Sequence, residues 1–441
     1  MEKNIESLVN NKISKINNNG NKYEIGKVTK VREFILEIKG LSAVEFFEEV
    51  RIGNKGIGYV SAISENFITV AVVKEFEKIN IGDEVIATGE EFSINYSHQA
   101  FGHIIDIFGE DKLTNKKFEK LYKLAIERPN VSIMDRGTVE RPLLTGIAGI
   151  DLVYPIGKGQ RQLIIGDKKT GKTQIALDTI VNQKDKKMKC IYVAIGKTKK
   201  EVKEIYSELS KRGAMKSTII LMASNDEKTP ILSLAPYAAV SIAEEYMYKG
   251  EDVLVIIDDL KRHADAYREI SLLQGKVPGR EAYPPDIFYA HSRMLEKGCQ
   301  HIKGGSITIL PIVETKGGDI TDYISTNIIS ITDGQLVLSR KNFENGQKPA
   351  INFGLSVSRL GGQVQEASIK KVGTKVKREL LSYLETRDVY ALTNEDEMSA
   401  EMREKLRNGK MMLEGFQQFK YSPLTAKEIL DRFSVYAEEG K

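Results

Sequence analysis

The chain is 441 residues long, with 41% hydrophobic and 29% charged residues, which is the composition of a globular protein of two or three domains. Its 65 basic and 61 acidic residues leave a net charge of +4, so the overall charge does not require a polyanionic partner. Because Cys190 and Cys299 have no CxxC spacing and the polar N-terminus has no signal-peptide pattern, we expect a protein of the reducing cytoplasm without a disulfide framework.

Residues 1–22 have a pattern of their own. Apolar residues stand at helical spacing and are followed by an asparagine-rich stretch, so we expect a short amphipathic segment. Such a helix has nothing within its own segment against which to bury its apolar face. It is either a docking helix for a partner or a frayed end, and its apolar residues are Ile5, Leu8, Val9, Ile13 and Ile16.

Residues 23–92 have the pattern of short strands. The runs IGKVTKV, FILEIKGL, VRIGNKGIGYV, FITVAVV and DEVIATG are rich in β-forming residues and are separated by glycines. Short strands at this spacing predict a small closed barrel. We interpret this barrel as a domain without a site of its own.

Residues 93–362 alternate strands with helices. The runs QLIIG, CIYVAIG, TIILMAS, VLVIIDDL and SITILPIVE have the continuous apolar character of strands that are buried on both faces. Separated by helical stretches, they predict an α/β domain with a parallel sheet. Residues 363–441 have helical patterns only, in VKRELLSYLETRDVYAL, AEMREKLRNGKMMLEG and TAKEILDRFSVYAEEG, so we expect a C-terminal helical domain.

The segment GDKKTGKT follows the strand RQLIIG and precedes the helical stretch QIALDTIV. This is the context of a phosphate-binding loop, in which the backbone closes round phosphate oxygens and N–H groups at the helix start point at them. Lys172 would reach the β- and γ-phosphates, and Thr173 would hold Mg²⁺. The predicted nucleotide-binding residues are Gly166, Asp167, Lys168, Lys169, Thr170, Gly171, Lys172, Thr173 and Gln174.

A second signal is the apolar strand VLVIIDDL, which ends in Asp258 and Asp259. Such a strand delivers an acid to the phosphate end of the sheet, where it can hold Mg²⁺ through water. An apolar strand followed by an acid is common, but a phosphate loop upstream makes the pattern informative. We predict Asp258 as the residue linked to Mg²⁺.

With these motifs, the chain resembles the alpha subunit of F-type ATP synthase, the regulatory partner of the catalytic beta subunit in a rotary motor. The similarity covers the chain from Ile5 onward and is dense in LLTGIAGIDLVYPIGKGQRQLIIGDKKTGKTQIALDTIVNQ, PGREAYPPDIFYAHSRMLE, GDITDYISTNIISITDGQ and KPAINFGLSVSRLGG. It implies a phosphate-loop NTPase core of the RecA-like type, a six-stranded N-terminal β-barrel and a C-terminal helical domain. A beta subunit would carry GxAGVGKT, so the charged GDKKTGKT favours alpha.

The residue after the strand IYVAIG bears on catalysis. Hydrolysing members of this superfamily place a glutamate there to orient the attacking water, and alpha subunits generally place a glutamine. This chain has Lys197, whose ammonium has donors but no acceptor and cannot take a proton from water. The alternative is that Lys197 turns to solvent and a carboxylate from elsewhere in the chain orients the water.

The resemblance also implies residues that act on a neighbouring subunit. Arg359, in SVSRLGG, corresponds to the arginine that crosses the interface and stabilises charge on the phosphate bound to beta. Ser330 corresponds to an interface serine near the same phosphate. An always-charged, planar guanidinium suits the role of an arginine finger. The alternative for Arg359 is an ordinary structural ion pair.

The resemblance assigns Phe288 and Arg293, in IFYAHSR, to the adenine pocket. Gln418 matches one glutamine of the family's pair, whereas Lys420 replaces the other, so adenine hydrogen bonding departs from the family pattern. The chain also ends soon after YSP, where family members continue for several helices. We therefore expect a divergent, C-terminally shortened paralogue.

These features predict a non-catalytic, ATP-binding subunit of a rotary ATPase, with ATP or ADP and Mg²⁺ as ligands. Its partners would be a beta-type catalytic subunit in an alternating hexameric ring, the central rotor stalk and, through residues 1–22, a peripheral-stalk subunit, with no nucleic acid. Lacking an apolar run of roughly 18–20 residues, the chain would lie at the cytoplasmic face of the cell membrane only through the complex.

Two other classes of protein share the core. A homohexameric export-type ATPase should carry the glutamate where Lys197 stands. An RNA-translocating hexamer would need stacking aromatic residues and basic pore loops, and the barrel runs FILEIKGL and FITVAVV look more like packing segments.

Overall fold

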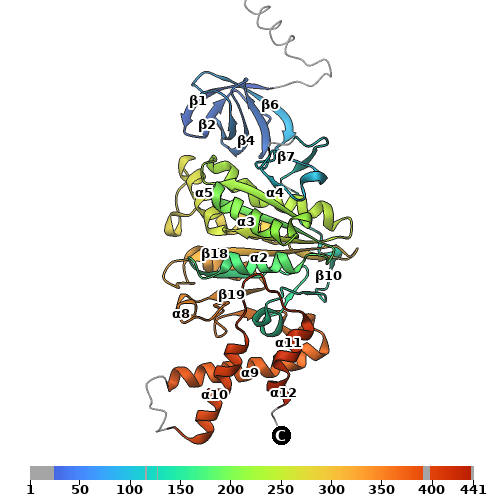
Figure 1. The fold of residues 1–441 in the computed structure, drawn as a ribbon. Helices are drawn as coiled ribbons and strands as arrows, with labels where there is room; N and C mark the ends of the chain where they lie inside the picture. The colour runs from blue at the N-terminus through green and yellow to red at the C-terminus, as the bar shows by residue number, and fades with distance from the viewer. Residues whose placement is uncertain (1–23, 115–116, 127, 391–397, 439–441) are drawn as a thin grey trace, which may run out of the picture.

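The computed structural model describes residues 24–114, 117–126, 128–390 and 398–438. They form three parts stacked along one direction: a barrel at one end, a layered α/β domain in the middle and a group of helices at the other end (Figure 1). The predicted amphipathic segment 1–22 lies outside the described residues. Of the helices in the described part of the chain, none combines the length and apolar character needed to cross a membrane.

The six strands of the N-terminal part close into a barrel in the order β1-β2-β5-β4-β3-β6, which confirms the predicted fold (Figure 1). Side chains such as Leu36, Val50 and Val70 are fully buried in it. The run VRIGNKGIGYV contributes to two strands, because the chain reverses at residues 53–55. The strands are β1 (Ile25–Arg32), β2 (Ile35–Lys39), β3 (Glu48–Ile52), β4 (Gly56–Ile63), β5 (Ile68–Glu75) and β6 (Glu84–Glu91).

The middle domain is built on a ten-stranded sheet whose central strands are parallel. Side chains of β14 alternate between two apolar cores, with Ile191 and Val193 in one and Cys190 and Tyr192 in the other. Burial on both faces explains the continuous apolar runs of the sequence. In sheet order the strands are β20 (Val357–Ser358), β19 (Gly334–Leu338), β13 (Leu163–Asp167), β18 (Ser306–Thr315), β16 (Asp252–Asp258), β14 (Met188–Lys197), β15 (Thr218–Ser224) and β8 (Ile104–Ile105); β17 (Cys299–His301) pairs with β18 and β10 (Arg136–Gly137).

Helices cover both faces of this sheet. Residues of α4, α5, α6 and α7 belong to the core that contains Ile191, whereas residues of α2 and α3 belong to the core that contains Tyr192. Two small ribbons lie outside the sheet: β7 (Ser93–Tyr96) with β9 (Tyr122–Ala125), and β11 (Pro142–Leu143) with β12 (Ile156–Gly157). The helices are α2 (Lys172–Asn182), α3 (Lys199–Lys211), α4 (Thr229–Met247), α5 (Leu260–Leu273), α6 (Ile287–Leu295), α7 (Tyr323–Ile331) and α8 (Arg340–Glu344).

The C-terminal runs form helices as predicted, and the last run divides in two at Ser434. Ile369 and Leu380 of the first helix enter the same apolar core as α2 and α3. The segment between the second and third helices returns to the middle domain, where the Leu424 N–H donates to the Gly146 carbonyl oxygen at 2.8 Å. The helices are α9 (Ala367–Val389), α10 (Ala400–Gly415), α11 (Ala426–Phe433) and α12 (Val435–Glu438).

A buried ion pair connects α4 to the end of α6. The Lys297 Nζ donates to Glu244 Oε1 at 2.7 Å, and the two side chains are 7% and 1% exposed. The same ammonium donates to the carbonyl oxygens of Arg128 and Pro129 at 2.8 and 3.0 Å. Removing one member of such a pair leaves a buried group without its partner.

We expect Lys297→Met to lower the free energy of unfolding by about 3–5 kcal/mol, because Glu244 and two carbonyl oxygens lose their donor. Urea denaturation followed by circular dichroism measures this, since the chain has no tryptophan. The control is Lys211→Met, which removes an exposed pair with Glu208 and should change stability by less than about 1 kcal/mol. Equal effects of the two variants would contradict the prediction.

Candidate nucleotide-binding site

The loop between β13 and α2 is held in shape by its own residues. The Asp167 carboxylate accepts hydrogen bonds from Thr315 Oγ1 and the Gly318 N–H, both at 2.7 Å, which fixes the loop to the end of β18. Gly171 precedes α2 with φ of 99°, a conformation that favours glycine. Asp167 and Gly171 thus shape the loop. Lys168 to Thr173 line the cavity above it, whereas Gly166 and Asp167 do not.

The cavity has a volume of about 1140 Å³, large enough for a nucleotide. Its walls come from the phosphate loop, Gln174, the ends of β14, β16 and β18, residues 346–350 and residues 417–420. Five carboxyl side chains line it: Asp178, Glu201, Asp258, Asp259 and Glu314. The basic side chains that line it are more numerous and comprise Lys168, Lys169, Lys172, Lys197, Arg262, Lys348 and Lys420.

Lys172 is buried and donates through Nζ to the carbonyl oxygens of Gly166 at 2.8 Å and Asp167 at 2.6 Å. Loss of hydration on burial lowers the pKa of this ammonium. The side chain therefore lies folded along its own loop and lines the cavity, and one of its three N–H donors is left for a phosphate.

The Asp258 carboxylate is the meeting point of three donors. Its Oδ2 accepts from Thr173 Oγ1 at 2.7 Å and from the Tyr192 hydroxyl at 2.5 Å. The Lys197 Nζ lies 3.1 Å from the same oxygen. Thr173 and Asp258, the two residues predicted for Mg²⁺, are thus brought together at the phosphate end of the cavity.

Lys197 reaches Asp258 because β14 contains a bulge near its end. The pairing with β15 skips Gly196, whose φ is 64°, so that Lys197 rather than Gly196 pairs with Ser224. In a regular strand, side chains alternate and Lys197 would lie on the face opposite Tyr192. The extra residue of the bulge breaks this alternation. Lys197 is 19% exposed and lines the cavity, so the side chain does not turn to solvent.

Three other carboxyl groups line this part of the cavity, and two of them cap helices. Asp259 caps α5 by accepting from the Lys261 N–H at 2.6 Å, and burial, followed by the charge of Asp258, raises its pKa to about 7. The Glu201 carboxylate accepts from the Thr198 N–H and hydroxyl, both at 2.8 Å, in the cap of α3. Glu314 lies at the end of β18.

Gln418 and Lys420, which were predicted for the adenine pocket, line the cavity, but the Gln418 amide is engaged within the protein. Its Nε2 donates to the Gly146 and Ser422 carbonyl oxygens at 2.6 and 2.7 Å. Phe419 beside it is 88% exposed.

Phe288 and Arg293 do not line this cavity, which corrects the expected adenine pocket. Phe288 lies exposed on α6, and the Arg293 guanidinium lies 5.2 Å from the centre of the Tyr289 ring. The cavity is lined instead by Phe343 and Lys348, with Lys348 Nζ 5.3 Å from the centre of the Phe343 ring. The sequence pattern did not single them out, because KNFENGQKP has lysine as its basic residue, whereas IFYAHSR offers an aromatic residue and an arginine. The available signal was their place in the chain, because Lys348 begins the segment KPAINFGLSVSR and Phe343 lies just before it.

Arg359 and Ser330 lie outside this cavity on the surface of the chain. Arg359 follows β20, where its N–H donates to the Asp333 carbonyl oxygen at 2.9 Å, and among the described residues its guanidinium forms no ion pair. Ser330 is exposed on α7, and its hydroxyl donates to the Thr326 carbonyl oxygen at 2.9 Å.

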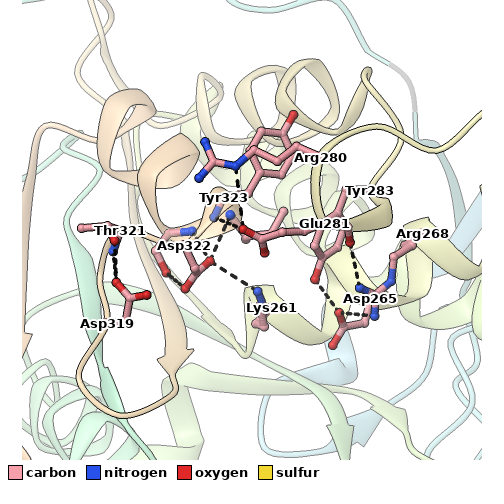
Figure 2. A network of polar contacts seen from close by, with 12 residues as sticks. Lys261, Asp265, Arg268, Arg280, Glu281, Tyr283, Asp319, Thr321, Asp322 and Tyr323 are labelled. Atoms are coloured by element: carbon pink, nitrogen blue, oxygen red, sulfur yellow. Dashed lines mark hydrogen bonds and ion pairs between the residues drawn. The ribbon is translucent and has the colours of Figure 1, made fainter.

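The helix that carries Ser330 is fixed to the helix that begins beside the cavity. Figure 2 shows Lys261 of α5 reaching Asp322, with 3.4 Å between Nζ and Oδ1. Asp322 caps α7 by accepting from the backbone at its start, and the Tyr323 N–H donates to Glu281 Oε1 at 3.1 Å. The network joins α5, the loop that contains Glu281 and α7 into one unit (Figure 2).

A phosphate loop between a strand and a helix of a parallel sheet, with an acid at the end of a neighbouring strand, defines a phosphate-loop nucleotide-binding protein. Comparison with known proteins agrees, since residues 146–358 match the nucleotide-binding domain of the ATP synthase alpha/beta family.

ATP synthase subunit alpha of Macrococcus caseolyticus is 42% identical to the chain over 424 residues, which cover 96% of the chain and 84% of that relative. Proteins of the same name from Lactobacillus johnsonii and Caldanaerobacter subterraneus subsp. tengcongensis are 42% and 43% identical, with the same shares covered. The chain therefore belongs to the family of ATP synthase alpha subunits.

The partly buried carboxyl group of Asp178 should make the stability of the fold depend on pH. Its Oδ1 accepts from Gln174 Nε2 at 2.8 Å and from the Tyr421 N–H at 2.7 Å, and burial raises its pKa to about 6 from 3.8. The folded protein holds this proton more tightly than the unfolded chain does, so protonation of Asp178 stabilises the fold. This contribution to the free energy of unfolding is complete below about pH 3.8 and is lost as pH rises through about 6.

We expect Asp178→Asn, which keeps the accepting oxygen, to remove this loss. The free energy of unfolding of the variant should rise relative to the unsubstituted protein by on the order of 2 kcal/mol between about pH 4 and 7, measured by urea denaturation. Asp431→Asn, at an exposed position on α11, is the control. Parallel pH profiles for Asp178→Asn and the unsubstituted protein would show that Asp178 does not titrate in this range.

Proposed function

We propose that this alpha subunit binds ATP or ADP with Mg²⁺ without hydrolysing it, and that Arg359 acts at the catalytic site of a neighbouring beta-type subunit. The observation that carries the first part is the contact between Lys197 and Asp258. The residue at the end of β14 is a cation held at the phosphate end of the cavity, where hydrolysis needs a group that accepts a proton.

The residues present fit a nucleotide with a divalent cation. Thr173 Oγ1 and Asp258 Oδ2 lie 2.7 Å apart and would hold Mg²⁺ together, directly and through water. When bound, Mg²⁺ neutralises phosphate charge. Lys172 and the N–H groups at the start of α2 would bind the phosphates, and Phe343 and Lys348 would lie at the adenine end together with Gln418 and Lys420.

The exposure of Arg359 supports a role outside its own subunit. A guanidinium on the surface beside the edge strand β20 can enter a site on an adjacent chain, and a planar, permanently charged group matches phosphate oxygens. The proposed assembly is a ring in which this chain alternates with a beta-type subunit around a central stalk, at the cytoplasmic face of the membrane. The relatives' name, ATP synthase subunit alpha, supports it.

The purified chain should bind ATP, as measured by isothermal titration calorimetry, and show negligible phosphate release. Lys172→Met should weaken ATP binding by about tenfold or more, because a buried phosphate-binding charge is lost. Lys203→Met, at an exposed position on α3, should have no effect. Steady hydrolysis by the chain alone would contradict the proposal and favour a self-sufficient export-type ATPase, with Glu314 as the first carboxylate to test.

In a complex with the beta-type subunit, Arg359→Ala should lower ATP hydrolysis by about 10³- to 10⁵-fold, because the charge on the transferring phosphate loses its partner. The affinity of this chain for ATP should not change, since Arg359 lies outside its cavity. Arg359→Lys should restore little of the ATP hydrolysis, because an ammonium lacks the planar fork of a guanidinium. Arg378→Ala, at an exposed position on α9, is the control. Normal hydrolysis by the Arg359→Ala complex would rule out the finger.

A further inference from the structure

Lys197 shares a carboxylate oxygen with the residue pair that would hold the metal. Its Nζ lies 3.1 Å from Asp258 Oδ2, the atom that also accepts from Thr173 Oγ1 at 2.7 Å. With the Tyr192 hydroxyl at 2.5 Å, this oxygen already has three hydrogen-bond partners. An ammonium is therefore built into the place where a phosphate-loop site ordinarily holds its divalent cation.

A metal ion and this ammonium compete for the same carboxylate. Mg²⁺ bound through Thr173 and Asp258 would meet the like charge of Lys197 at the same carboxylate oxygen, or would displace Lys197 from its ion pair. Either event costs free energy, because like charges repel strongly in a partly buried cavity and a separated pair must be rehydrated. Metal binding therefore adds less to nucleotide affinity here than in a site with a neutral or acidic residue at position 197.

The rest of the cavity can neutralise a triphosphate without a metal. Lys168, Lys169 and Lys172 lie in the phosphate loop, and Arg262, whose side chain lies near Gly196, lines the same cavity. Ammonium and guanidinium groups donate charge-assisted hydrogen bonds to phosphate oxygens. The charge that Mg²⁺ ordinarily supplies is thus already present in side chains.

We propose that Lys197 takes the charge-neutralising role of Mg²⁺ in this cavity, so that the chain binds metal-free ATP nearly as tightly as Mg·ATP. The inference rests on the proposed nucleotide-binding function and specifies its cation requirement. It assigns Lys197 as the residue that determines this requirement.

The test compares ATP affinities of the isolated chain in EDTA and in excess Mg²⁺ by isothermal titration calorimetry. For the unsubstituted protein, the two dissociation constants should agree within about threefold. Lys197→Gln removes the ammonium and keeps a polar side chain of similar length. This variant should bind metal-free ATP about tenfold or more weakly than the unsubstituted protein, and Mg·ATP equally well or better. The ratio of the dissociation constant in EDTA to that in Mg²⁺ should therefore increase.

Lys199→Gln is the matched control, because Lys199 is exposed two residues further on, pairs with Asp226 and does not line the cavity. It should leave both affinities unchanged. A second measurement uses Mn²⁺ in place of Mg²⁺. Electron paramagnetic resonance should show tighter binding of Mn²⁺ to the ATP complex of Lys197→Gln than to that of the unsubstituted chain.

The outcomes separate the two proposals. If the unsubstituted chain loses ATP in EDTA and Lys197→Gln loses it to the same extent, the role of Lys197 is overturned while nucleotide binding stands. Equal Mn²⁺ affinity in both proteins would likewise overturn it. If neither buffer supports ATP binding, the proposed nucleotide-binding function itself fails.

Discussion

One carboxylate oxygen, Oδ2 of Asp258, organises the phosphate end of the cavity. A carboxylate that is almost fully buried must be paired, and this one is paired by Thr173 from α2 and by Tyr192 and Lys197 from β14. The register of the sheet makes this possible, since Ala194 of β14 lies opposite Asp258 of β16. The carboxyl ends of neighbouring parallel strands therefore converge with the start of the loop helix at one edge.

The same arrangement separates holding a nucleotide from reacting with it. A phosphate loop, a buried lysine and an acid at a strand end form a binding site in any protein of this architecture. What such a site does next depends on the group placed over the terminal phosphate. Here β14 delivers Lys197 to Asp258 at the loop end of the cavity, while the exposed Arg359 follows the edge strand β20 and lies outside the cavity. Under the proposed function, the cavity binds and the surface arginine assists a neighbour.

Two of the three stacked parts, the middle domain and the C-terminal helical part, form the cavity. The sheet and the loop provide its phosphate end, whereas residues 346–350 and 417–420 close the other end. The last of these segments returns from the C-terminal helices, tied to the middle domain through Leu424 and Gln418. The closure of this end of the cavity thus depends on packing between parts that are far apart in sequence.

The sequence alone determined the elements and the chemistry of the loop. Its periodicities indicated the barrel, the buried parallel strands and the C-terminal helices, because hydrophobic spacing reports which faces are buried. GDKKTGKT and VLVIIDDL indicated the phosphate loop and the acid, because both are local patterns of strand, turn and helix. The place of Lys197 at a strand end identified it as a residue that bears on catalysis, but the sequence did not show that it pairs with Asp258.

Tertiary structure alone decided which residues meet. The bulge at Gly196 turns Lys197 to Asp258, and no pattern within one strand specifies a contact to another. Phe343 and Lys348, rather than Phe288 and Arg293, line the cavity, because two segments with similar residue types are distinguished only by where the chain places them. Contacts between distant segments depend on the packing of the whole domain, which local sequence patterns do not encode.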